Sequence, residues 1–179
     1  MAHDLTTAQP VIASERLSLR PLRPSDQGLI ALYAGDLRVA QNTRSIPHPY
    51  PPGAAEALVT RAVADDRRED IWAMDASETG LAELLGLISL KRLSHDRSEI
   101  GYWVAPAFWN TGFATEAVQA IIAANPQGVK TLFAEVFQSN PVSARVLTNA
   151  GFDYIGDAEA FSVAQNCTVP IWTYLRKLA

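Results

Sequence analysis

Apolar residues along the chain follow two spacings, alternate positions as in strands and every third or fourth position as in helices. These patterns predict strands over residues 16–22, 71–76, 84–93, 99–104, 131–137, 151–156 and 168–175. They predict helices over residues 24–33, 54–68, 114–124 and 141–150. Three of the strands follow one another through short turns between residues 71 and 104, which predicts an antiparallel meander. The sequence therefore indicates an α/β fold.

A strand, a turn of small residues and a helix follow one another between Gly101 and Glu116, which read GYWVAPAFWNTGFATE. Pro106 ends the strand because it has no backbone N–H to donate within a sheet. The helix begins around Gly112 and Ala114, whose small side chains leave the free N–H groups of its first turn exposed. Such groups bind anions together with the helix dipole. The stretch predicts a phosphate-binding site, although close helix packing would also explain the small residues.

Two other phosphate-binding motifs do not match this stretch. A P-loop needs two glycines five residues apart followed by Lys and Ser or Thr, and the dinucleotide motif needs three glycines early in the chain. Here Gly112 stands alone, late in the chain, with no lysine after it. A nucleotide-binding α/β protein of another kind is therefore a weaker alternative.

Residues 46–53 read IPHPYPPG, and half of them are proline. Proline lacks an N–H and has a fixed φ, so this segment is neither a helix nor a central strand. We expect a semi-rigid loop. It is either a plain connection between helices or a wall of a substrate pocket that presents His48 and Tyr50.

The chain has 179 residues, 48% of them apolar, and a net charge of −4. These values predict one soluble domain over residues 1–179, with residues 1–13 as a flexible extension. The acidic balance argues against a nucleic-acid partner, and no apolar run is long enough to span a membrane. The lone Cys167 excludes an internal disulfide and a cysteine-built metal site. Because the start lacks a signal-peptide pattern, we expect a cytoplasmic protein.

Two segments resemble the GCN5-related N-acetyltransferase (GNAT) superfamily: 109–117, WNTGFATEA, and 140–152, NPVSARVLTNAGF. The order of the predicted elements over residues 14–178 is also similar to that superfamily. The strand 99–104 and the proline-rich loop resemble its ribosomal-protein N-acetyltransferase (RimJ/RimL-type) branch. The resemblance implies a mixed, mostly antiparallel sheet of about seven strands with a central splayed pair, flanked by about four helices.

The resemblance implies acetyl-CoA as the cofactor, coenzyme A as a product and no metal. It places the cofactor between strands 99–104 and 131–137, with the diphosphate on the amides of residues 111–115 and the pantetheine arm along residues 102–104. The residues implied in cofactor binding are Tyr102, Trp103, Val104, Asn110, Thr111, Gly112, Phe113, Ala114, Thr115, Asn140 and Ser143. The chain departs from the family pattern at 109–111, where a Gln or Arg, a glycine and a basic or polar residue are usual.

Three residues are candidates for proton transfer. Ser143 would protonate the departing thiolate, or would only satisfy backbone groups of its helix. Glu99 would act as a base, directly or through water, or would be a surface charge. Glu135 lies in the middle of a strand among apolar neighbours and either lines the cleft or faces solvent.

We expect an acetyltransferase in which a primary amine attacks the thioester carbonyl directly. The acceptor would be a protein N-terminus, such as that of a ribosomal protein, or a small amine, and the protein a monomer or homodimer. Candidate acceptor-binding residues are His48, Tyr50 and Trp103. The alternative from another class is a catalytically inactive module of the same fold that binds or senses acyl-CoA. Turnover across a panel of amines separates these two functions.

Overall fold

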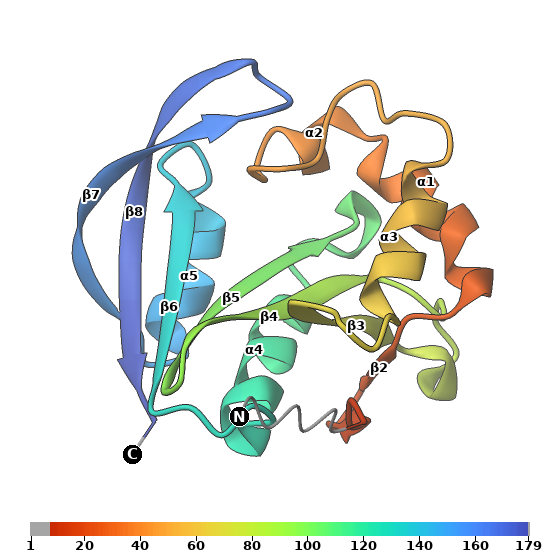
Figure 1. Ribbon diagram of the computed structural model, residues 1–179, viewed down its shortest axis with the longest axis horizontal. Helices are drawn as coiled ribbons and strands as arrows, with labels where there is room; N and C mark the ends of the chain where they lie inside the picture. The colour runs from red at the N-terminus through yellow and green to blue at the C-terminus, as the bar shows by residue number, and fades with distance from the viewer. Residues whose placement is uncertain (1–7, 179) are drawn as a thin grey trace.

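An eight-stranded sheet runs through the computed structural model, which describes residues 8–178 (Figure 1). The strands lie in the order β1-β2-β3-β4-β5-β6-β8-β7, and the neighbours are antiparallel except for β5 and β6. Their bounds are β1 Ile12–Ala13, β2 Ser18–Pro21, β3 Glu69–Asp75, β4 Gly86–Ser94, β5 Arg97–Val104, β6 Thr131–Phe137, β7 Asp153–Ser162 and β8 Cys167–Lys177. The predicted mixed, mostly antiparallel sheet and its meander are confirmed.

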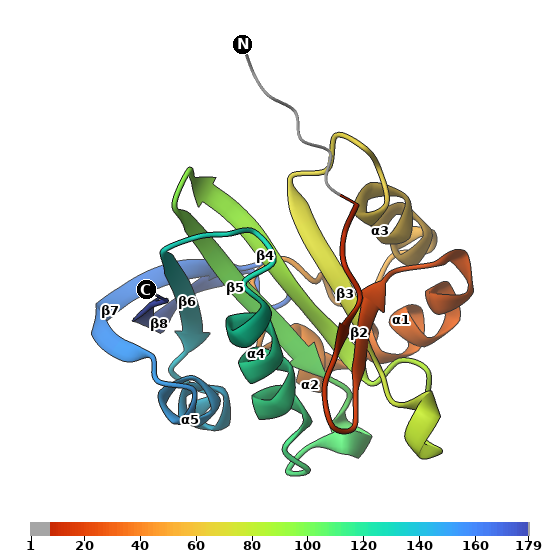
Figure 2. The same cartoon turned by 90° about the horizontal axis from the view of Figure 1, so that it is seen from below.

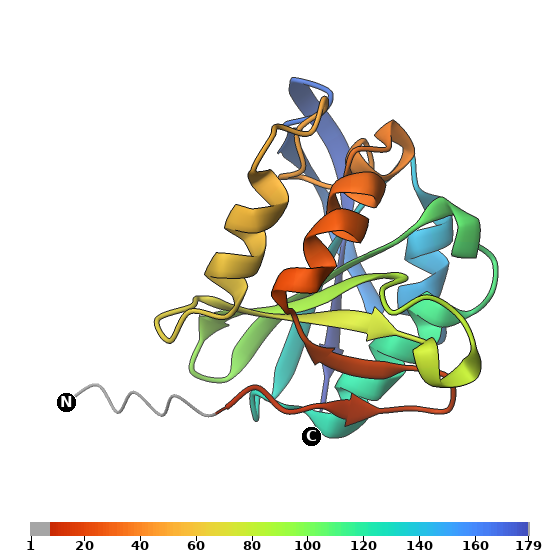
Figure 3. The same ribbon diagram turned by 90° about the vertical axis from the view of Figure 1, so that its right-hand side faces the viewer.

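Helices cover both faces of this sheet (Figures 2 and 3). The helices are α1 Gln27–Ala34, α2 Leu37–Ala40, α3 Ala54–Ala62, α4 Phe113–Ala124 and α5 Pro141–Asn149, with short 3-10 turns at Pro24–Asp26, Ser77–Thr79 and Pro106–Phe108. Alternate side chains of a strand point to opposite faces. On β3, Ile71 and Ala73 pack with residues of α1 and α3, whereas Trp72 and Met74 belong to the core that includes α4 and α5.

The central parallel pair separates along its length. β5 and β6 are paired only from Arg97 and Thr131 to Glu99 and Phe133. Beyond that point β5 stays paired with β4 up to Val104, and β6 stays paired with β8 up to Phe137. The predicted splayed pair is therefore present, and it leaves the facing edges of both strands without a sheet neighbour.

Three elements differ from the sequence prediction. The helix predicted over 54–68 ends at Ala62, because Arg67 turns back to form an ion pair with Asp70 at 2.7 Å and Glu69 already begins β3. A short helix, α2, was missed in the polar stretch before residue 45, and Asp36 caps it through the N–H of Arg38. The strand predicted over 151–156 continues to Ser162 across a bulge near Gly156.

The start of the described chain is attached to the sheet. β1 pairs with β2 through Ile12 and Leu19, and the Trp72 indole N–H donates to the Pro10 carbonyl at 2.8 Å. The prediction of a flexible extension over 1–13 is therefore wrong at residues 12–13, where backbone pairing holds the chain, and at Pro10, which accepts the Trp72 bond. Residues 1–7 lie outside the described part.

Candidate active site

A cleft of about 540 Å³ opens on the side where β5 and β6 part. Residues of five segments line it: 38–43, 100–104, 108–115, 134–137 and 139–149. Most of the predicted site residues therefore meet in one place: Tyr102, Trp103, Val104, Asn110, Thr111, Gly112, Phe113, Ala114, Thr115, Glu135, Asn140 and Ser143. The cleft joins the predicted phosphate-binding turn to two of the three predicted proton-transfer residues, Glu135 and Ser143.

The turn before α4 exposes backbone donors to this cleft. Asn110 and Gly112 have left-handed backbone conformations, with φ of 60° and 82°, and Gly112 directly precedes the helix. The Glu116 N–H donates to the Gly112 carbonyl at 3.0 Å. Within residues 8–178, no backbone hydrogen bond occupies the preceding N–H groups of residues 113–115. Free N–H groups at a helix start hold anions, so the turn fits a diphosphate.

Trp109 connects this turn to the end of β5. Its indole N–H donates to the Val104 carbonyl at 2.7 Å, and the Arg38 guanidinium lies 6.0 Å from the ring centroid. Tryptophan at this position therefore ties the turn to the strand, which a shorter polar side chain would not do in the same way. The Val104 oxygen, one of the groups expected along the cofactor arm, already accepts this bond.

Two hydroxyl groups meet where α5 begins beside β5. The Asn140 side chain caps α5 by accepting from the Ser143 N–H at 3.4 Å. Ser143 Oγ donates to Tyr102 Oη at 3.0 Å, and Tyr102 Oη donates to the Ser143 carbonyl at 3.0 Å. Burial raises the pKa of Tyr102 well above its usual value, so the phenol stays neutral.

The Tyr102 side chain is a site feature that the sequence reasoning missed. The sequence predicts a cofactor-binding role for Tyr102, but it does not predict the bond between its hydroxyl and Ser143. The strand alternation held the signal, because it places Tyr102 on the same face as Ile100 and Val104, against the core that includes α4 and α5. Trp103 packs instead with the core on the α1 and α3 side, and both residues also line the cleft.

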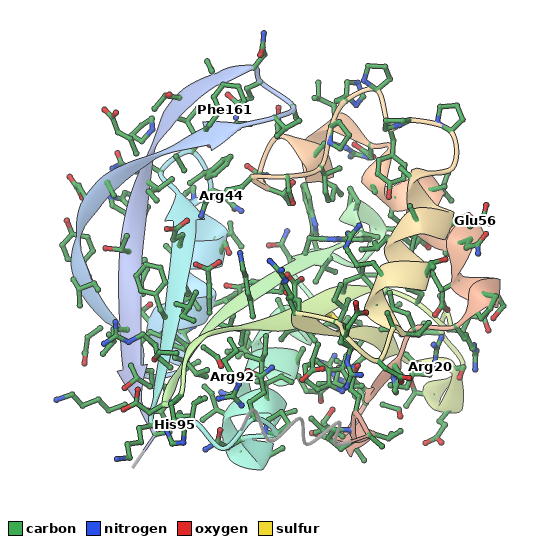
Figure 4. All side chains as sticks on the ribbon, in the orientation of Figure 1. Arg20, Arg44, Glu56, Arg92, His95 and Phe161 are labelled. Carbon is green, nitrogen blue, oxygen red and sulfur yellow. The ribbon has the colours of Figure 1, made fainter. Side chains whose placement is uncertain are left out.

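A second polar group lies at the β6 wall of the cleft. Arg44 Nη1 forms an ion pair with Glu135 Oε2 at 2.5 Å, and Figure 4 shows Arg44 beside β6. The Arg44 segment is attached to the β7–β8 hairpin, since the Val163 N–H donates to the Arg44 carbonyl at 3.0 Å. Arg44 is 91 residues from Glu135 along the chain, so no local pattern predicts this contact.

Glu99 lies at the point where β5 and β6 separate. It is half-buried and is not among the residues that line the cleft. Burial raises the pKa of the Glu99 carboxyl above its usual value, and the negative charge of Glu135 raises it further. Arg44 and Lys91 act in the opposite direction. Glu99 and Glu135 therefore interact electrostatically, as a carboxyl pair near the end of the cleft.

The proline-rich loop does not line the cleft. His48 and Tyr50 are absent from its walls, and Tyr50 packs against the core between α1 and α3. The wall that the proline-rich loop was expected to form consists instead of residues 38–43, which belong to α2 and the turn after it. The structure thus places the predicted acceptor residues apart from the other candidates, with the exception of Trp103.

The described residues hold neither a metal-ligand cluster nor a membrane-spanning helix. Over residues 8–178, no group of three or more His, Cys, Asp or Glu side chains could hold a metal ion. In the same range, no helix has the length and apolar character needed to cross a membrane. Cys167 has an exposed thiol outside the cleft.

The parted strand pair beside an open helix start defines the class of the protein as an α/β fold with a cleft suited to an anionic ligand. The sequence identifies the family: residues 16–153 match the family model described as Acetyltransferase (GNAT) domain. The chain belongs to this acetyltransferase family, and the predicted resemblance is confirmed.

Relatives and solved structures agree with this assignment. An uncharacterized N-acetyltransferase of Bacillus subtilis, YoaA, is 29% identical over 157 residues, which are 82% of this chain and 85% of that protein. Mycobacterium smegmatis RimJ in complex with CoA-disulfide superposes with a TM-score of 0.81 and 18% identity, covering 95% of this chain and 88% of RimJ. Spermidine N-acetyltransferase from Vibrio cholerae, in complex with CoA and spermine, has a TM-score of 0.76 and 17% identity, covering 92% and 97%.

Proposed function

We propose that the protein transfers the acetyl group of acetyl-CoA to a primary amine. The observation that carries this proposal is one cleft with free helix amides at one wall and a carboxyl pair near another. The similar structures of RimJ and of spermidine N-acetyltransferase contain CoA and support the same cofactor here. The acceptor is a protein N-terminus, such as that of a ribosomal protein, or a small amine.

The residues of the cleft fit acetyl-CoA along its length. The N–H groups of residues 113–115 would hold the diphosphate, and the free edge of β5 at residues 102–104 would pair with the pantetheine arm. Bound acetyl-CoA supplies a thioester that a neutral amine can attack. Asn140 keeps the start of α5 in place, so that Ser143 lies next to the arm.

Proton transfer is assigned to Glu99, at the point where β5 and β6 separate, and to Ser143 at the cleft wall. Glu99 accepts the proton of the incoming amine, directly or through water, and Glu135 lies close enough to change its pKa. Ser143 donates a proton to the departing thiolate and regains one from water in the open cleft, and Tyr102 holds the Ser143 hydroxyl in place. A raised carboxyl pKa suits a base, because the best catalytic pKa lies near the working pH.

The direct test measures release of free thiol from acetyl-CoA across a panel of amines. The panel contains spermidine, other diamines and short peptides with different first residues. Amine-dependent thiol release that is matched by acetylated product in mass spectrometry would support the proposal. Tight binding of acetyl-CoA with no release for any amine would instead favour the inactive binding or sensing module.

The pH dependence of the rate identifies the base. Below its pKa Glu99 is protonated and cannot accept a proton, so kcat/KM for the amine should rise as the pH passes through the raised pKa of Glu99. This rise is the acidic limb of the pH profile. Glu135→Gln removes a neighbouring negative charge and should move the acidic limb to lower pH. Arg44→Gln removes a positive charge and should move it to higher pH.

Glu99→Gln should lower kcat by about 100-fold, in the range of general base catalysis, and should remove the limb. Glu78→Gln, on an exposed turn, is the matched control and should leave the profile unchanged. If Glu135→Gln removes the limb and Glu99→Gln keeps it, Glu135 is the base and the assignment to Glu99 is wrong.

A further inference from the structure

Arg16 lies directly behind the helix start that would hold the diphosphate. Its Nη1 donates to the Thr111 carbonyl at 2.9 Å, and its Cζ lies 4.2 Å from the centre of the Phe113 ring. A Cβ atom at Gly112 would come within 3.3 Å of Arg16 Nη2. Arg16 precedes β2 and is 95 residues from Thr111 along the chain, so the fold alone brings this cation to the turn.

Arg16 also contacts the acid in the first turn of α4. Arg16 Nε lies 3.5 Å from Glu116 Oε1, and the Arg16 backbone N–H donates to the same oxygen at 3.2 Å. The other oxygen, Oε2, is buried and has no hydrogen-bond partner within the described chain. A carboxylate in the first turn interacts well with the helix dipole but repels a second anion at the same place. A diphosphate at this helix start therefore needs the charge of Glu116 to be balanced.

The turn itself offers no positive charge for this purpose. Residues 110–112 are Asn, Thr and Gly, none of which carries a charge. The Arg16 guanidinium has five donors in a rigid plane. It can bond the Thr111 carbonyl, stack on Phe113 and offset Glu116 simultaneously.

We propose that Arg16 is the positioning residue of the diphosphate site, which fixes the turn through Thr111 and balances the charge of Glu116. The inference rests on the proposed use of acetyl-CoA. The positive charge at the diphosphate site then comes from Arg16, in the segment before β2, rather than from the turn. Arg16 is assigned no contact with the reacting atoms, so its loss should change cofactor affinity and leave the chemical step unchanged.

The test compares Arg16→Gln, Glu116→Gln and the double variant in the full-length protein. We expect Arg16→Gln to raise the Kd for CoA and the KM for acetyl-CoA by about tenfold, the effect of losing one charged hydrogen-bonding partner. The kcat at saturating acetyl-CoA and the KM for the amine should stay within about twofold of the wild-type values, since the acceptor side is unchanged. Glu116→Gln added to Arg16→Gln should restore most of the affinity, because the unbalanced carboxylate is then gone.

A second substrate separates positioning from a general structural role. S-acetylpantetheine carries the same thioester and no diphosphate, so Arg16→Gln should leave its kcat/KM unchanged. Arg23→Gln is the matched control, because Arg23 forms an exposed ion pair with Glu83 at 2.8 Å and does not line the cleft. Arg23→Gln should leave kcat/KM unchanged for both acetyl-CoA and S-acetylpantetheine.

Two results would overturn the inference. One is wild-type CoA affinity in Arg16→Gln. The other is an equal loss of kcat/KM with acetyl-CoA and with S-acetylpantetheine, without rescue by Glu116→Gln, which would make Arg16 a structural contact only. Failure of the proposed function looks different, because the wild-type protein itself would then neither bind CoA nor release thiol.

Discussion

Gly112→Glu should abolish CoA binding, with a loss of at least about 100-fold in affinity, while the fold persists. The new carboxylate would stand beside the free N–H groups of residues 113–115, where the diphosphate is expected, and would repel it. Calorimetric titration with CoA measures the affinity, and circular dichroism checks the fold.

A matched control separates charge from backbone strain. Gly112 has φ of 82°, and a residue with a side chain loses about 1–2 kcal/mol in this region. Gly80 has φ of 84° with open space around its Cβ position, and it lies outside the cleft. Gly80→Glu should therefore cost similar stability and keep full CoA affinity. CoA affinity equal to wild type in Gly112→Glu would remove the phosphate site from this turn.

Ser143→Ala should lower kcat by about 100-fold, in the range expected for loss of a proton donor, and change the Kd for CoA by less than about threefold. The reason is that Ser143 Oγ lies at the cleft wall and would act only when the thiolate leaves. Steady-state kinetics with acetyl-CoA measures kcat, and calorimetry with CoA measures the Kd. Equal losses in both would reduce Ser143 to a binding residue.

Thr148→Val is the control for removing a hydroxyl from α5. The Thr148 hydroxyl bonds the Arg145 carbonyl at 3.1 Å and is exposed, so this variant should leave kcat unchanged. Tyr102→Phe tests the partner of Ser143 directly. If the hydroxyl of Tyr102 acts by holding Ser143, Tyr102→Phe should lower kcat in the wild type and add little in the Ser143→Ala background.

Much of the fold followed from local signals in the sequence. β6 spans the predicted residues 131–137, and β5 ends before Pro106 as its missing N–H requires. The helix start after Gly112 and the start of α5 at Pro141 were also predicted, because both depend on residues adjacent in the chain. Turn chemistry and helix capping are local, so a single sequence contains them.

The remaining features depend on contacts between distant segments. Arg16 meets Thr111, and Arg44 meets Glu135, only after the sheet has brought them together. The hydroxyl pair of Tyr102 and Ser143 joins a strand to a helix 41 residues further on. α2 was missed because its four residues are too few for a periodic pattern. Charge partners and cleft walls of this kind require the tertiary structure.

The most direct test of the account is a crystal structure of the protein with coenzyme A. The account predicts diphosphate oxygens within hydrogen-bond distance of the amides of residues 113–115, and the pantetheine arm between β5 and β6 with its sulfur near Ser143. Coenzyme A bound at another surface, with the cleft between the two strands closed by side chains, would contradict it.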